Sequence, residues 1–182
     1  MGREYYPRSA RLLHWTLAVM VVSMLLLGAS MVDSLGIWRA EALRWHKWTG
    51  LLVLILVMIR IANRLRFRAP DLPADLPGWQ VLAARVMMIA LYCAMLVMPL
   101  SGWMMQGAAG VPVVLPGGWV LPDLVEPDIR LYGLLRSVHG LVSWLFMVLI
   151  VGHVGAALRH GWVRSDGVLN SMTGRFSQGG QP

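Results

Sequence analysis

Four long apolar segments constrain the fold of this chain more than any other feature of its sequence. They cover residues 10–32, 43–65, 81–105 and 131–158, and each is long enough to cross a hydrocarbon core about 30 Å thick as an α-helix. The chain is 57% hydrophobic and only 14% charged, so a water-soluble fold would expose large apolar areas. Lipid is therefore its predicted solvent.

The segments between these apolar runs are short, which places consecutive helices next to each other in opposite directions. We therefore predict an all-α membrane protein, an antiparallel bundle of four transmembrane helices. The bundle is expected to form one domain over residues 1–176. A disordered tail is expected at 177–182.

Charge is distributed unevenly between the two ends of the predicted bundle. The end that holds both termini carries eleven arginines against four acidic residues, a sum of +7, whereas the opposite end carries five basic and five acidic residues. Because positive residues accumulate on the cytoplasmic side of membrane proteins, we predict that both termini lie in the cytoplasm. The positive charge is dispersed over helix ends and forms no recognition element, so no nucleic-acid partner is predicted.

All five histidines lie on or at the end of an apolar segment, where an ionisable side chain is costly unless it has a partner or a function. His139 and His153 are 14 residues apart on one predicted helix, so they share a face and stand about 21 Å apart along its axis. Under the predicted topology, His14 lies at the cytoplasmic depth of His153, and His46 lies at the outer depth of His139. His160 follows about 10 Å closer to the cytoplasm.

Two neutral imidazoles on facing helices can fill both axial positions of a haem iron, an arrangement suited to electron transfer. Covalent attachment of haem requires a C-x-x-C-H motif, and the chain has one cysteine, Cys93, so the haems would be b-type. A zinc site or a proton pathway is the alternative, although no acidic residue lies deep in a predicted span. His160 could replace His153 as a ligand, line a quinone pocket or face the lipid headgroups.

Short motifs surround these histidines. They are RLLHW at 11–15, WHKWTG at 45–50, SVHG at 137–140, and GH at 152–153 followed by RH at 159–160. In order and spacing they resemble the bacterial cytochrome b561 family, which is itself similar to the cytochrome b subunits of nickel–iron hydrogenases. The resemblance extends from about residue 5 to residue 162. It implies a multi-pass protein of the bacterial inner membrane with two haem b groups, one ligated by His14 and His153 near the cytoplasm and one by His46 and His139 near the periplasm.

Small members of this family include membrane-bound superoxide oxidases. The resemblance thus implies an oxidoreductase that passes electrons from superoxide, or another periplasmic donor, to ubiquinone at the cytoplasmic side, with His160 at a possible quinone site. The alternative is a haem-containing anchor subunit that links a periplasmic dehydrogenase or hydrogenase to the quinone pool. Arg44, Lys47 and Arg136 flank the outer histidines and could attract the superoxide anion or pair with haem propionates. The sequence leaves both roles, the electron donor and the oligomeric state open.

Overall fold

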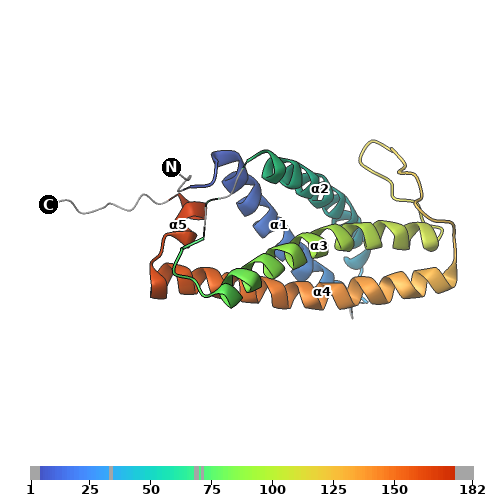
Figure 1. Ribbon diagram of the computed structural model, residues 1–182. Coiled ribbons are helices and arrows are strands. Elements are labelled where there is room, and N and C mark those ends of the chain that lie inside the picture. Colours follow the sequence, from blue (N-terminus) through green and yellow to red (C-terminus); the bar gives the residue numbers. More distant parts are fainter. Residues whose placement is uncertain (1–4, 33–34, 68–69, 71, 175–182) are drawn as a thin grey trace.

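Four long helices make up most of the protein. The structure is a computed structural model that describes residues 5–32, 35–67, 70 and 72–174. The long helices are α1 (Arg8–Val32), α2 (Arg39–Arg66), α3 (Gly78–Ala108) and α4 (Ile129–Leu158), followed by the π-helix η1 (Arg159–Arg164) and the short α5 (Val168–Thr173) (Figure 1). All four are long and apolar enough to cross a membrane. The four helices cover the four predicted segments and extend at most four residues beyond them at either end.

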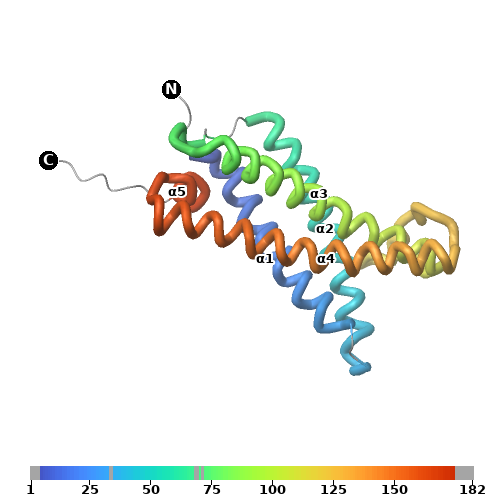
Figure 2. Tube along the Cα trace, turned by 60° about the horizontal axis from the view of Figure 1, so that its bottom comes forward, coloured from blue at the N-terminus to red at the C-terminus, as the bar shows by residue number. Residues whose placement is uncertain are grey.

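The helices associate as two antiparallel pairs. α1 packs along α2, α3 packs along α4, and α2 joins the pairs by packing on α3. Figure 2 shows that the two pairs cross at an angle and do not run parallel to each other. The predicted four-helix membrane bundle is therefore confirmed as a fold class. We call the end of the bundle where the described chain starts and stops the terminal end, and the end with the loop between α3 and α4 the loop end.

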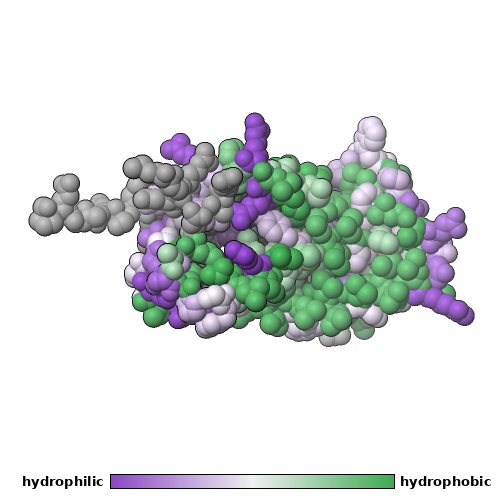
Figure 3. All heavy atoms as spheres, in the orientation of Figure 1, coloured by the Kyte–Doolittle hydropathy of each residue, from purple (hydrophilic) through white to green (hydrophobic). Residues whose placement is uncertain are grey.

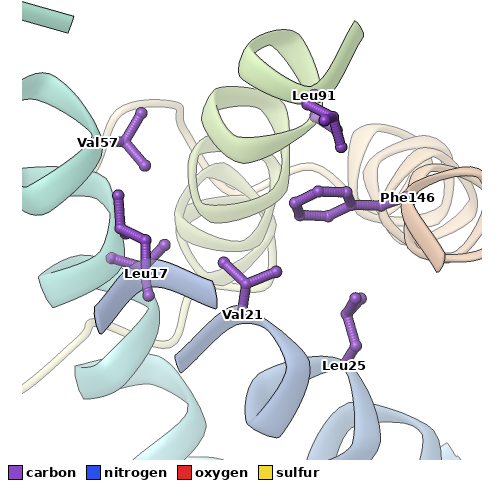
Figure 4. Packing of buried hydrophobic residues seen from close by; sticks show 8 residues of the cluster. Leu17, Val21, Leu25, Val57, Leu91 and Phe146 are labelled. Carbon is purple, nitrogen blue, oxygen red and sulfur yellow. The ribbon is translucent and has the colours of Figure 1, made fainter. Parts of the chain in front are cut away.

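A small apolar core lies where the two pairs meet (Figure 4). Its buried members are Leu17, Val21, Leu25, Val53, Val57, Leu91, Ala94 and Phe146. Many other large apolar side chains are exposed along the helices, and Figure 3 shows them as a hydrophobic band between more polar ends. Lipid tails are as apolar as leucine, so a membrane bundle needs no larger core, and the band is the surface expected to contact lipid.

The loop end is organised by hydrogen bonds to backbone groups. Trp48 on α2 donates its indole N–H to the carbonyl of Val114 in the loop at 2.7 Å. Asp128 ends the loop in an extended conformation, and its carboxylate accepts from the backbone N–H groups of Arg130 and Leu131 at 2.7 and 3.0 Å. This N-cap satisfies two of the free donors at the start of α4 and fixes where the helix begins.

The terminal end is closed by a segment that sequence reasoning did not anticipate. After α4 the chain continues through η1, turns at the left-handed residues Ser165 and Gly167, and returns as α5. The backbone N–H of Tyr6 donates to the carbonyl of Ser171 at 3.2 Å, which joins the start of the chain to α5. Trp15 of α1 donates to the carbonyl of Met172 at 3.3 Å. The predicted disordered tail at 177–182 lies outside the described residues.

Asp166 is the centre of a polar network at the terminal end. Its carboxylate accepts from Nδ1 of His160 at 2.6 Å and from Nε of Arg164 at 2.9 Å, and Arg164 also reaches Asp75 between α2 and α3 at 2.5 Å. Burial raises the pKa of Asp166, but the hydrogen bonds from His160 and Arg164 outweigh this and hold the pKa below the ordinary 3.8. The ionised carboxylate therefore stabilises the fold of η1 and α5.

Replacing Asp166 with Asn should lower the free energy of unfolding by about 1–3 kcal/mol at neutral pH, because charged hydrogen bonds are lost. A depressed carboxyl pKa contributes stability that is present above its unfolded value and lost as pH falls through the folded value. Thermal unfolding in detergent should therefore separate wild type from variant at pH 7, and the gap should narrow as the pH falls below the ordinary carboxyl pKa of 3.8. Asp75→Asn is the control, with a smaller effect because Asp75 is exposed. A gap that does not change with pH would contradict this role of Asp166.

Candidate functional site

One pair of histidines lies toward the terminal end, between α1 and α4. His14 is in the second turn of α1 and His153 is near the end of α4, and both side chains are half-buried. Their ring centres are 6.1 Å apart and their planes are inclined by 77°. The structure thus brings together the two residues that were predicted to share the cytoplasmic depth. We call them the terminal-end pair.

A second pair lies toward the loop end, between α2 and α4. His46 and His139, also half-buried, have ring centres 6.4 Å apart and planes inclined by 67°. His139 and His153 belong to the same uninterrupted helix, so this loop-end pair stands about 21 Å along α4 from the terminal-end pair. One helix therefore contributes a histidine to each site and sets the spacing between the sites.

The separation of the rings fits two ligands on opposite sides of one metal ion. With metal–nitrogen bonds of about 2 Å, and each nitrogen about 1.2 Å from its ring centre, two such imidazoles have centres about 6.4 Å apart. The observed 6.1 and 6.4 Å are close to this value. Within the part of the chain that the structure describes, no three His, Cys, Asp or Glu side chains are grouped to hold a metal. Each pair offers two ligands, which is the number that a porphyrin-bound iron leaves open.

Ser101 of α3 orients the imidazole of His139. The serine is buried, and its Oγ donates to the carbonyl of Met98 at 3.0 Å while lying 3.0 Å from Nδ1 of His139. Because a hydroxyl has one proton, the Ser101 oxygen accepts from Nδ1–H, and Nε2 of His139 keeps a free lone pair. Metal-ligating histidines commonly have such a partner on the other nitrogen. Sequence reasoning missed Ser101, since one serine in an apolar helix gives no signal of its own.

Glycines lie beside the loop-end pair and leave room for its rings. A Cβ atom added at Gly28 of α1 would lie 3.3 Å from Cε1 of His46, and one added at Gly102 of α3 would lie 3.3 Å from Cε1 of His139. Any larger residue would therefore press on the imidazoles. By contrast, a Cβ at Gly50 or Gly140, which also neighbour these histidines in sequence, would meet no atom of the described chain within 4 Å. That space is compatible with a flat group beside each helix.

His46 carries the one polar atom of the four paired imidazoles that is buried without a hydrogen bond. Its Nδ1 has no partner among the described residues. Burial of an unsatisfied donor or acceptor costs about 1–3 kcal/mol, so an orphaned nitrogen is expected where a site awaits a further group. The observation is consistent with an imidazole that is held for ligation rather than for packing.

Arg60 of α2 lies beside the terminal-end pair. Its Nη1 donates to the carbonyl of Ala10 at 3.3 Å, and its guanidinium carbon lies 5.9 Å from the ring centre of Tyr92 on α3. Ala10 lies one helical turn before His14 on α1, so the guanidinium is held at the depth of the terminal-end pair. Arg60 is one of the eleven arginines from which the orientation of the bundle was predicted, and no other role was predicted for it. The signal that could have found it is its position inside the predicted span 43–65, where a charged residue marks a functional site.

The basic residues predicted near the loop-end pair are only partly brought together. Arg44 and Lys47 line a groove of about 430 Å³ between the start of α2 and the loop that joins α3 to α4. Lys47 donates to Gln106 at 3.1 Å, and Arg44 pairs with Glu41 at 2.9 Å. Arg136 is exposed on α4 and does not line this groove.

His160 lies outside the terminal-end pair. It is the second residue of the π-helix η1, and its Nδ1 is bound to Asp166. The ring that faces His14 is that of His153. The structure thus gives His160 a polar partner at the end of the bundle and places it beyond the pair along the chain.

Comparison with known proteins identifies the family. The family model described as prokaryotic cytochrome b561 matches residues 5–175. Cytochrome b561 homolog 2 of Escherichia coli K12 is 29% identical over 177 residues, which cover 96% of this chain and 94% of that protein. Cytochrome b561 homolog 1 of the same organism is 31% identical over 130 residues, 71% of this chain and 73% of that protein. The family match spans nearly the whole chain, so this protein belongs to the prokaryotic cytochrome b561 family of haem b membrane electron-transfer proteins.

Proposed function

We propose that this protein carries electrons across the bacterial inner membrane, from a periplasmic donor to ubiquinone, through two haem b groups. The observation that carries the proposal is the presence of two histidine pairs at two depths, each with the ring separation expected of two axial ligands. His14 and His153 would ligate the inner haem, near the cytoplasm. His46 and His139 would ligate the outer haem.

Each haem, when bound, supplies an iron that gains and loses one electron. The chain supplies the rest. Two histidines on each iron would leave no coordination position open, which would favour electron transfer over binding of a substrate at the metal. The Ser101 hydroxyl holds His139 in the tautomer whose Nε2 can ligate.

The apolar core separates the two sites. Phe146 lies on α4 seven residues from both His139 and His153, is 4% exposed, and points into the core cluster (Figure 4). About 10 Å of helix rise separates it from either histidine. Tightly packed apolar side chains between the sites exclude water and hold the spacing constant, and two macrocycles would fill much of the 21 Å between the centres.

The orientation that we propose has both termini in the cytoplasm, so that the loop end faces the periplasm. It is supported by the excess of arginine at the terminal end and the balanced charge at the loop end. A reporter that is active only in the periplasm should give signal when fused in the loop near Pro122 and none when fused after Gly174. The opposite pattern would reverse the direction of electron transfer.

Superoxide is the donor that we propose. Each superoxide ion would give up one electron and leave as oxygen, and two such electrons with two protons would convert ubiquinone to ubiquinol. The groove at the loop end supports this choice. Arg44 is paired there with Glu41. Lys47, however, has only the neutral Gln106 as a partner among the described residues, and a local positive charge raises the encounter rate of a small anion. The zero net charge of this end as a whole restricts the effect to the groove.

A second candidate function is that of a membrane anchor for a periplasmic redox subunit. The exposed apolar side chains of Trp119 and Val120 on the loop favour it, since such residues are typical of a docking surface. The two functions differ in a simple way. A free-standing superoxide oxidase reduces its haems with superoxide in the absence of any other protein, whereas an anchor requires its partner.

Replacing His139 with Ala should remove the outer haem and keep the inner one, because only one of the two ligand pairs is broken. His153→Ala is the matched variant and should remove the inner haem instead. The measurement is the haem content per chain together with the reduction potential of the haem that remains. Two haems per chain in either variant would show that the pairs are not the ligands.

Replacing His160 with Ala should leave haem reduction by superoxide unchanged and slow reoxidation by ubiquinone about tenfold or more, if the imidazole assists proton delivery to the quinone. Stopped-flow absorbance of the purified protein separates the two half-reactions. Asp166→Asn is the control that keeps the imidazole but removes its carboxylate partner, and a smaller slowing is expected. Unchanged reoxidation in His160→Ala would exclude this role, and loss of a haem would make His160 a ligand.

A further inference from the structure

α2 carries a charged residue at the depth of the terminal-end pair. Arg60 follows His46 by 14 residues, so it lies on nearly the same face of the helix and about 21 Å closer to the terminal end. The same interval separates His139 from His153 on α4. α2 therefore presents His46 to the loop-end site and Arg60 to the terminal-end site.

The contacts of Arg60 hold its guanidinium inside the bundle. Nη1 donates to the carbonyl of Ala10, one turn before His14 on α1, and the guanidinium lies over the ring of Tyr92 on α3. Both contacts are to neutral groups. Arg60 is thus fixed from two sides, next to the inner site.

Arg60 lacks a carboxylate partner among the described residues. The ion pairs that these residues form involve Arg44, His160 and Arg164, and none includes Arg60. A partly buried cation without a counter-charge is costly, and a carbonyl and a cation–π contact compensate for that cost only in part. Such a charge is expected where an anionic or electron-accepting group binds nearby.

We propose that Arg60 is the electrostatic partner of the inner haem and raises its reduction potential relative to the outer haem. This inference rests on the proposed two-haem function. Reduction adds one negative charge to a haem, and a nearby cation stabilises that charge in a medium of low dielectric constant. Carboxylates of the same haem are the class of anion that the guanidinium would pair with. Arg60 therefore favours the movement of electrons from the outer site to the inner site.

A purely structural role for Arg60 makes a different prediction. The side chain links α1, α2 and α3, so its loss would loosen the terminal end. Loosening lowers stability, but it does not by itself shift the potential of one haem and spare the other. The reduction potential therefore separates a positioning and electrostatic role from a linking role.

The test is a redox titration of the purified, haem-loaded protein and three variants. In Arg60→Gln both haems should stay bound. The equilibrium of the inner haem should shift about tenfold toward the oxidised form, so its reduction potential should fall by about 59 mV for this one-electron step. In Arg60→Lys the reduction potential of the inner haem should stay close to the wild-type value, because the positive charge is kept. Tyr92→Leu removes one of the two contacts that hold the guanidinium but keeps the charge, so the potential of the inner haem should fall less than in Arg60→Gln, and that of the outer haem should not change.

An unchanged inner potential in Arg60→Gln with both haems bound would overturn the inference, and so would an equal shift of both haems. If Arg60→Gln does not accumulate, Arg60→Met removes the charge and keeps a long side chain. A fall in the potential of the inner haem alone would again support the inference, and an unchanged inner potential would overturn it. The haem content of the wild-type protein is measured first. A wild type without two haems contradicts the proposed function itself, whereas two haems with an unchanged potential contradict only the role of Arg60.

Discussion

An imidazole within a bilayer is costly unless it has a function, and four of the histidines in this chain face each other in pairs across helix interfaces. α4 contributes one histidine to each pair, and α1 and α2 contribute the other two. The remaining long helix, α3, supports one of these rings. α3 packs along α4 and places Gly102 and Ser101 against His139, so the helix without a paired histidine supports the ring of one. The two helix pairs cross, and α4 faces α1 at one depth and α2 at the other.

The two histidine pairs have different polar surroundings, and under the proposed function this difference favours electron transfer from the loop end to the terminal end. At the loop end, His139 is hydrogen-bonded to a neutral serine and Nδ1 of His46 is left without a partner. At the terminal end, an arginine without a carboxylate partner among the described residues contacts the backbone one turn before His14, and His160 and Asp166 form a polar network beyond the pair. Under the proposed function, a positive charge beside the site that is closer to the quinone makes electron transfer in that direction more favourable. The core around Phe146 keeps the distance between the sites fixed.

The sequence predicted the spans and the pairing of depths because both follow from local rules, namely helix length, helix rise and the alternating direction of consecutive helices. The interval of 14 residues between His139 and His153 was enough to place them on one face. The prediction could not include η1 and α5, because the return of the chain depends on Asp166 and on contacts with Tyr6 and Trp15 far away in sequence. Ser101 and Gly28 were missed for the same reason, since their importance lies in a ring on another helix. Arg60 was visible as a charge inside a span but was assigned to topology alone.

Two haem b groups per chain, each ligated by two histidines, are what the proposed electron path requires. The most direct measurement is the haem-to-protein ratio of the purified wild-type protein, combined with electron paramagnetic resonance of its oxidised form. The arrangement of the two pairs predicts two haems per chain, both low-spin and with distinct signals, because the two sites have different surroundings. A ratio of one haem per chain, or a high-spin signal from an iron with an open position, would contradict it.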